Sequence, residues 1–467
     1  MTIIRDRELI EDINDIPVAL IVSCIKEHQA GIPRLNKLEK YYEGEHAILE
    51  RPLAGEEMGL PNNKIVANHA KYITDISTGY TFGKPIKYEG EQIEPITAAY
   101  KEIDIVSHDQ EMAKDLSIFG IGLELHFMSS DEVPIPKVTV IDPRQIFLVV
   151  DDTVEYKSLF AVHYYEKRDI DNEVIGWNIN VYTESLIVKY FAKDIESGDY
   201  IMVDVLDHYH QKVPVVEFWN NEEQQGDFEQ QISLIDAYNL LQSDRINDKE
   251  QLVDALLKLV GVSLGDTEDE QSETAKMIKK HKIIELPEGA DAEWLTKGLN
   301  ETEVEVLKTA IKKDIHEFSM VPNLTDENFA SNSSGVAMKY KLFGLEQLAV
   351  IKERYYVQGL RERLKLFANI LEVKAKAVKV SDVEITMIRN LPENELTIQD
   401  IVSLIGLVSN ATLLSLLPFV EDATEEVKKL KIQLKEDRER NQQAFGFPTD
   451  PSDHPEDVTG DDAEIEE

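Results

Sequence analysis

Cysteine is nearly absent from this sequence of 467 residues, which contains Cys24 alone. One cysteine cannot form an internal disulfide, and no Cys/His cluster has zinc-site spacing, so packing must stabilise the fold. Long apolar runs are missing as well: no apolar stretch without charge reaches about 18 residues, and the charged start Arg5–Glu8 lacks the apolar segment expected of a signal peptide. We therefore expect a protein of cytosolic origin that does not enter a membrane.

Positive charge is also scarce, because 49 Lys and Arg stand against 89 Asp and Glu and give a net charge of -40. Only nine of the acidic residues lie in residues 448–467, so the body itself is acidic. Duplex binding normally needs a basic face that displaces counterions, so free nucleic acid should be repelled. Two interpretations stay open: the acidity keeps the protein soluble, or it lets a surface stay near DNA without sticking to it.

Recognisable catalytic motifs are missing too. The Gly120-Ile121-Gly122 fragment lacks the third glycine of a phosphate loop and precedes a strand pattern, so it predicts a β-turn. His208 and His210 could hold a metal, but no third ligand is placed by sequence, so we interpret them as surface histidines. His69 and His316 lie in helical patterns and are interpreted as packing histidines. Without a Walker loop, HExxH or GxSxG motif, we expect no catalytic residue, metal or cofactor.

The strongest pattern that is present is a helix, a break and a much longer helix. Apolar residues at helical spacing predict the first helix over residues 300–322, ended by Pro322. Residues 323–334 are rich in Asn, Ser and acids and cannot bury a face, so they predict a loop. From residue 335 the helical pattern continues for about forty residues, or about 55 Å, with Gly344 and Gly359 as candidate bend points.

A run of short strands precedes this region. Apolar residues alternate with period two over residues 120–220, between Asp/Asn/Gly turns, which predicts an antiparallel β-rich unit. Helices are predicted on its N-terminal side over residues 1–45, where they form a peripheral layer, and over residues 62–80 and 96–117. The chain is therefore expected to be an α+β protein that is mainly helical.

Two of the predicted helices, residues 232–260 and 300–320, flank a charged and mixed insertion. We expect them to run antiparallel as a stalk that carries a small α/β projection at its tip. The middle of the first helix, residues 242–251, is polar and suits a helix that partly faces water or a wet channel. The remaining predictions are a strand over 378–388, a buried helical hairpin over 401–420, a charged helix over 425–440 and a disordered acidic tail over 448–467.

Three passages carry a resemblance to a known family: Asn62–Tyr88, Val213–Asp254 and Phe329–Leu371. They occur in the family's order over most of residues 60–372, and the most specific run is Ser-Gly-Val-Ala-Met-Lys-Tyr-Lys-Leu at 334–342. On these passages the sequence resembles the portal proteins, or head–tail connectors, of long non-contractile-tailed bacteriophages of Gram-positive hosts.

The resemblance implies a ring of about twelve copies around a channel at one capsid vertex, through which double-stranded DNA is packaged and later ejected. The implied partners are other copies of the chain, the terminase large subunit, the head–tail adaptor, the major capsid and scaffolding proteins, and DNA bound without sequence specificity. The expected location is the virion, with assembly in the host cytoplasm.

The resemblance also implies a division into wing, stem, clip and crown. In chain order the expected parts are a wing over residues 1–230, a stem helix over 231–263, a clip over 264–299, a second stem helix over 300–322, a tunnel loop over 323–334, a long wing helix with a return strand over 335–394, a crown over 395–447 and the acidic tail over 448–467.

Candidate site residues follow from these parts. Lysines near the loop are expected to make transient phosphate contacts, or else to pair within their own helices. At the clip, a tryptophan is the expected apolar contact for a subunit or partner. The residues are, for the DNA-facing loop, Asp326, Glu327, Asn328, Phe329, Asn332 and Lys339; for the stem, Lys312 and Lys313; and for the clip, Trp294, Ile283 and Leu286.

Two other classes of function stay open at this point. A carboxylate-dependent metal hydrolase or nuclease would assemble its site from scattered acids and would show metal-dependent turnover. A capsid scaffold or adaptor without a channel would oligomerise differently. A ring with a central hole in negative-stain images would favour the portal over both.

Overall fold

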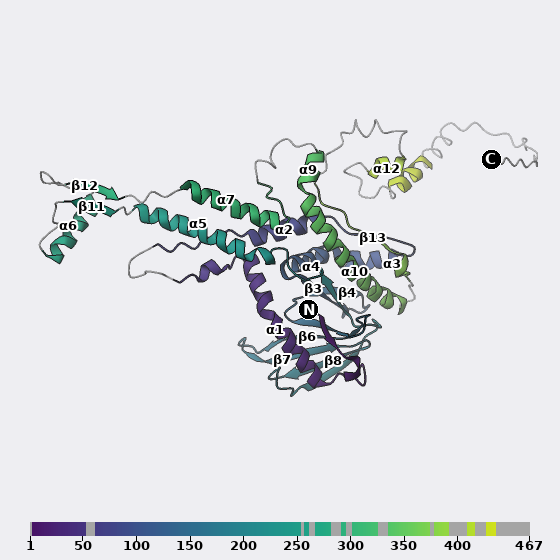
Figure 1. Ribbon diagram of the computed structural model, residues 1–467. Helices are drawn as coiled ribbons and strands as arrows, with labels where there is room; N and C mark the ends of the chain where they lie inside the picture. Colours follow the sequence, from purple (N-terminus) through teal and green to yellow (C-terminus); the bar gives the residue numbers. More distant parts are fainter. Residues whose placement is uncertain are drawn as a thin grey trace, which may run out of the picture. The chain divides into compact units, whose positions relative to one another are not determined.

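The computed structural model describes residues 2–52, 61–253, 256–260, 267–281, 291–295, 301–325, 335–373, 378–391, 409–415 and 426–435. The chain divides into two compact units, Met1–Leu391 and Pro392–Glu467. Helices and mostly antiparallel sheets share the first unit, as expected for the α+β class. Figure 1 shows the elements with their labels.

A six-stranded sheet is the largest β element, with strand order β1-β5-β6-β7-β8-β9. All neighbours are antiparallel except β1 and β5, which are parallel. The period-two prediction is confirmed for the strands it covered. The bounds are β1 Thr2–Arg5, β5 Ile146–Asp151, β6 Ser158–Arg168, β7 Val174–Tyr182, β8 Leu186–Ala192 and β9 Ile201–Asp207.

The N-terminal helical layer was predicted too long. Residues Thr2–Arg5 form β1, with fully buried Ile3 opposite Val149, and a short 3-10 helix η1 (Arg7–Leu9) follows. Helix α1 starts only at Val18 and then continues through exposed Pro33 to Glu43. It is not peripheral, because its apolar face is part of a core with the sheet; that core includes Ile21, Cys24, Ile25, Phe147 and Phe160.

A second, three-stranded sheet has the order β10-β3-β4. Helix α4 runs directly into it through Gly120, whose φ of 83° is left-handed; the glycine caps the helix, and β3 starts at the next residue in place of the predicted β-turn. The single helix predicted over residues 96–117 is two helices, because Asp104 between them also has a left-handed φ, 50°. The bounds are α3 Glu94–Glu102, α4 Ile105–Phe119, β3 Ile121–Met128, β4 Pro136–Ile141 and β10 Val215–Trp219.

The long helix is interrupted near its start. Helix α9 (Gly335–Lys341) and helix α10 (Phe343–Val373, 31 residues) are separated by a turn at Leu342. Gly359 has a packing role, because a Cβ there would lie 2.4 Å from the Phe218 ring. After η5 (Val380–Asp382), the predicted return strand shortens to β13 (Glu384–Thr386), which pairs with β2 (Lys87–Glu89).

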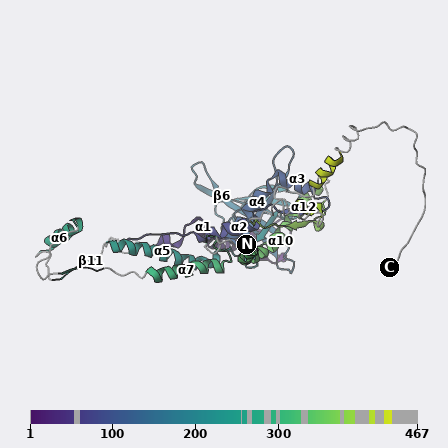
Figure 2. The ribbon, with the colours of Figure 1, turned by 90° about the horizontal axis from the view of Figure 1, so that it is seen from above.

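Helix α2 and the stalk complete the first unit. The stalk helix predicted to reach residue 260 ends at Val253, and the residues beyond it form a strand that pairs antiparallel with another strand of the insertion. Figures 1 and 2 both show α5 beside α7, with α6 and β11 beyond the end of the pair. The bounds are η2 Ala47–Glu50, α2 His69–Phe82, η4 Glu229–Gln231, α5 Ile232–Val253, β11 Leu256–Val260, α6 Glu268–His281, β12 Asp291–Leu295 and α7 Glu301–Phe318.

The second unit is described over two helical segments, α12 (Asn410–Ser415) and residues 426–435. The latter agrees with the predicted charged helix. Most of the predicted hairpin and the acidic tail lie outside the described residues. Among the helices that the structure describes, none is both long and apolar enough to cross a membrane.

Candidate functional site

The stalk helices α5 and α7 run antiparallel. Arg245, in the second half of α5, pairs with Glu305 at the start of α7 over 2.9 Å. At the other end, the His69 ring contacts both Tyr238 near the start of α5 and His316 near the end of α7, with centroid distances of 5.0 and 5.4 Å. The stalk orientation predicted from the sequence is therefore confirmed.

An aromatic and histidine junction joins the stalk to α2. His316 contacts the Tyr72 ring at 5.3 Å as well as His69. Burial lowers the pKa of His69 to about 4 and also lowers the pKa of His316, so both rings are neutral at pH 7. Neutral rings pack edge to face without the cost of burying charge, which confirms the interpretation of both as packing histidines.

The same junction holds the segment that leads into the predicted tunnel loop. The Tyr72 hydroxyl donates to the carbonyl of Pro322 (3.1 Å) and accepts from the backbone N–H of Leu324 (2.9 Å). His316 Nδ1 lies 3.0 Å from the carbonyl of Val321, and Met320 has a left-handed φ of 57°. The start of the predicted loop is thus bound to α2 and α7. The loop residues Asp326, Glu327, Asn328, Phe329 and Asn332 lie outside the described residues.

The three candidate lysines lie on the helices beside this segment. Lys313, on α7, is exposed and 3.9 Å from Glu317, the i,i+4 pairing that was the alternative to a phosphate contact. Lys312 is half-buried on α7, and Lys339 is exposed on α9. Within the described residues, neither Lys312 nor Lys339 has an acidic partner within 4.0 Å. Of the three candidates, only Lys313 therefore shows the pairing within its own helix among the described residues.

The polar middle of α5 faces water in part, as predicted: Lys249 and Glu250 are exposed, whereas Ser243 and Asn247 are buried. Side chains one turn apart accept hydrogen bonds from alternate backbone N–H groups of an extended segment, residues 61–67. This segment was predicted as the start of a helix, but the helix begins only at His69, after the Asn68 cap. The three bonds are Ala67 N–H to Asn239 Oδ1 (2.8 Å), Ile65 N–H to Ser243 Oγ (2.9 Å) and Asn63 N–H to Asn247 Oδ1 (2.7 Å).

Helix α10 carries a buried ion network that sequence reasoning missed. The guanidinium of fully buried Arg363 donates to Glu124 at 2.8 and 3.0 Å and to Asp109 at 2.6 Å. The Tyr356 hydroxyl donates to the same Asp109 at 3.0 Å. These residues come from α4, β3 and α10, so the network joins a helix layer to the three-stranded sheet.

Two histidines complete the network around Glu124. His108 Nε2 and His126 Nε2 lie 2.9 and 3.0 Å from its carboxylate. Burial alone would raise the pKa of Glu124, but the charge of Arg363 and the two histidine hydrogen bonds hold it well below its ordinary value. Burial lowers the pKa of His126, so its ring is neutral at pH 7. Glu124 therefore stays charged and paired, which suits a structural role.

A second buried ion pair lies about three turns earlier on α10. The Lys352 ammonium pairs with Asp227 and donates to Ser77 Oγ at 2.7 Å. Ser117 and Asn220 also donate to Asp227, at 2.6 and 2.9 Å. Both carboxylate oxygens of Asp227 thus have partners, as buried charge requires.

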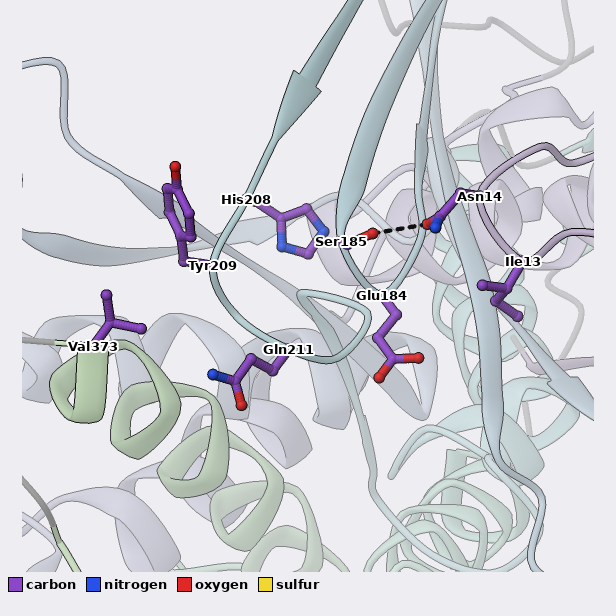
Figure 3. Close-up of a pocket in the computed structure, with 8 residues that line it drawn as sticks. All are labelled: Ile13, Asn14, Glu184, Ser185, His208, Tyr209, Gln211 and Val373. Atoms are coloured by element: carbon purple, nitrogen blue, oxygen red, sulfur yellow. Dashed lines mark hydrogen bonds between the residues drawn. The ribbon is translucent and has the colours of Figure 1, made fainter.

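A cavity of about 520 Å³ lies where β8 and β9 meet the end of α10. Figure 3 shows its lining, with Asn14 hydrogen-bonded to Ser185 at 2.9 Å. His208 lines this cavity, whereas His210 beside it is buried, so the interpretation of both as surface histidines is wrong. Burial lowers the pKa of His210 to about 3. Within the described residues, no three His, Cys, Asp or Glu side chains are arranged to hold a metal ion.

The predicted clip is described in part. Trp294 lies on β12, opposite Leu257 of β11, in the two-stranded sheet of the insertion. Ile283 and Leu286 lie outside the described residues. The prediction of a small α/β projection between the stalk helices is confirmed.

The chain is similar to known proteins over most of its length. The family described as phage portal protein, SPP1 Gp6-like, matches residues 21–442. The portal protein of Clostridium phage phiCD119 is 24% identical over 444 residues, which cover 89% of this chain and 95% of that protein. The portal protein of Bacillus phage SPP1 is 23% identical over 456 residues, with 91% and 88% covered. Since the match spans most of its length, this chain belongs to the SPP1 Gp6-like family of phage portal proteins.

Proposed function

We propose that this chain forms a ring of about twelve copies around a channel at one capsid vertex, through which double-stranded DNA is packaged and later ejected. It has no catalytic activity of its own and needs no cofactor. The observation that carries the proposal is the antiparallel α5–α7 pair with a small α/β insertion between its far ends, in a chain of the portal family. The ring is a component of the virion and assembles in the host cytoplasm.

The parts of the ring follow from the elements. Residues 1–230 and 335–394 make the wing, α5 and α7 the stem, and residues 264–299 the clip, which docks the terminase large subunit and later the head–tail adaptor. Residues 323–334 form the tunnel loop and 395–447 the crown. The wing and crown also meet the major capsid and scaffolding proteins.

Acidic walls suit this role because DNA must slide rather than bind. With a net charge of -40 per copy, the ring repels phosphates over the Debye length, about 8 Å at physiological salt. Lys312 and Lys339, which have no acidic partner within the described residues, supply the few transient phosphate contacts. Both lie on helices that flank the segment held by Tyr72.

Native mass spectrometry and negative-stain imaging test the ring directly. A ring of about a dozen copies with a central hole is the expected result. A monomer of 53.2 kDa at every salt concentration would remove the proposal. A closed oligomer without a hole would favour the scaffold or adaptor, and metal-dependent DNA cleavage would favour the hydrolase.

A charge change in the tunnel loop tests the channel. The double variant Asp326→Lys, Glu327→Lys should assemble normally but package DNA slowly at low salt. The ring of tunnel loops would then bind phosphate through several charge-assisted contacts. Added salt should relieve the defect, because it screens these contacts. The matched control is Asp131→Lys, Glu132→Lys, an exposed acidic pair in the turn between β3 and β4. Wild-type packaging by the loop variant at low salt would contradict the tunnel-loop assignment.

The clip assignment has its own test. Trp294→Ala should weaken ring closure or terminase docking, because buried aromatics dominate such interfaces. Unchanged rings together with unchanged packaging would assign Trp294 to ordinary packing within the insertion.

A further inference from the structure

Strand β9 is an edge strand that no described residue covers. It ends the six-stranded sheet, and all seven of its residues, Ile201–Asp207, are exposed. Five of them are large and apolar, from 41% exposed at Leu206 to 65% at Val203. An exposed apolar edge normally pairs with another chain or is blunted by charge. Here the charge is acidic: Asp207 lies in the strand and Glu184 in the adjoining turn, while Asp204 pairs with Lys189 of β8 over 3.3 Å.

Helix α10 presents an outward face of the opposite charge. Positions spaced by three or four residues are exposed along it: Phe343, Gln347, Ile351, Arg354, Gln358 and Arg361. We call this face the α10 stripe. Phe343 and Ile351 are 61% and 43% exposed. Within the described residues, neither Arg354 nor Arg361 has an acidic partner within 4.0 Å, which is unusual in a chain with a net charge of -40.

β9 and the α10 stripe complement each other in charge and apolar content. Both are exposed in the single chain, so they do not cover each other within one copy. The stripe spans about 27 Å of helix and β9 about 23 Å of strand. Each combines large apolar side chains with charge of one sign. Identical copies of so acidic a chain repel one another, so a contact between copies needs a local match of this kind.

We propose that β9 of one copy docks on the α10 stripe of a second copy. The contact is heterologous, because it joins two different surfaces, and contacts of this type close into rings when the rotation allows. The proposal rests on the ring proposed above and assigns one of its interfaces. Val203, Val205 and Leu206 meet the apolar part of the stripe, while Arg354 and Arg361 meet Asp207 and Glu184.

Charge reversal and charge exchange test this contact by native mass spectrometry and light scattering. Ring assembly should be lost in the double variant Arg354→Glu, Arg361→Glu and also in the double variant Glu184→Arg, Asp207→Arg. The variant with all four substitutions should assemble rings again. The regained ring would also show that each half-variant folds. The control is Lys101→Glu, an exposed charge on α3, which should leave assembly unchanged.

A cross-link places the two surfaces directly, because the sole native cysteine, Cys24, is fully buried. Chains with both Val205→Cys and Ile351→Cys should give a ladder of linked copies with a short bismaleimide, and either substitution alone should not. Val154→Cys with Ile351→Cys is the matched control, since Val154 is 97% exposed but lies outside β9.

The outcomes separate this contact from the ring itself. Assembly retained by either reversed variant, a charge exchange that does not regain rings, or a missing ladder would overturn the contact while wild-type rings persist. A wild-type chain that stays monomeric would overturn the ring and this contact with it.

Discussion

Helices α5 and α10 are both held by rows of polar contacts, but the chemistry of the rows differs. On α10 the contacts are ionic and buried, through Lys352 and Arg363. On the side of α5 that faces residues 61–67 they are neutral, through Asn239, Ser243 and Asn247 to backbone N–H groups. A row of ion pairs requires charged partners on other elements. A row of amide and hydroxyl acceptors, which we call the amide row, needs only backbone N–H groups of a segment that runs beside the helix.

The difference shows how a helix can be held in register without a complete apolar face. In the body, where a core surrounds α10, a mismatched register would leave buried charge unpaired, which is strongly unfavourable. Along the stem, amide and hydroxyl groups cost less to bury and a mismatch would cost less. We therefore expect substitutions in the α10 row to be the more damaging.

The largest expected effect is that of Arg363→Met, which leaves Glu124 and Asp109 buried without their cation. The free energy of unfolding should fall by about 3–5 kcal/mol, measured by urea denaturation. Lys365→Met, two residues away on the same helix and exposed, should change it by less than about 0.5 kcal/mol. Equal effects of the two substitutions would abolish the distinction between the buried row and the surface of α10.

Two glycines of α10 should respond with opposite sign. A Cβ at Gly359 would lie 2.4 Å from the Phe218 ring, so Gly359→Ala should cost about 1–3 kcal/mol through overpacking. A Cβ at Gly344 would have no neighbour nearer than 3.5 Å, so Gly344→Ala should stabilise the helix by up to about 1 kcal/mol. Thermal unfolding of the two variants checks this. Stabilisation by both would mean that Gly359 does not pack as described.

Acid should weaken the junction beside α5 through His69. Its pKa falls from 6.5 to about 4 on folding, so the unfolded chain binds a proton over this range that the folded chain does not. The contribution of His69 to the free energy of unfolding is thus complete above pH 6.5 and is lost as the pH falls toward 4. At pH 5 the free energy of unfolding should be lower by about 1–2 kcal/mol than at neutral pH. In urea titrations at several pH values, His69→Gln should flatten the slope in this window. An unchanged slope would assign the acid sensitivity to other histidines.

A smaller effect is expected in the amide row. Ser243→Ala removes the acceptor of the Ile65 N–H, and the free energy of unfolding should fall by about 1 kcal/mol. Hydrogen exchange at the Ile65 amide should become faster. A general loss of stability would instead speed exchange at many amides. Ile246→Ala, on the exposed side of the same helix, is the control. Unaltered exchange at Ile65 would contradict the role of the row.

The sequence by itself determined the elements whose pattern is local. Period-two alternation in the sequence located β3 to β9. Burial alternates clearly in β8, whereas β5 is buried and β9 exposed along its whole length. Apolar spacing and Pro322 bounded α7 closely, at Glu301–Phe318. The run at 334–342 indicated the portal family, which the match over residues 21–442 confirms.

Only the tertiary structure decided the features that depend on distant partners. Residues Thr2–Arg5 became a strand because β5, more than a hundred residues away, offered an edge. One side of the polar middle of α5 became a buried row because residues 61–67 lie beside it, and Leu256–Val260 became a strand because β12 pairs with it. Arg363 and Glu124 are 239 residues apart, and each by itself is typical of an exposed surface. Such contacts leave no periodicity in the sequence, because each partner satisfies a charge or a hydrogen bond that only the folded chain brings within reach.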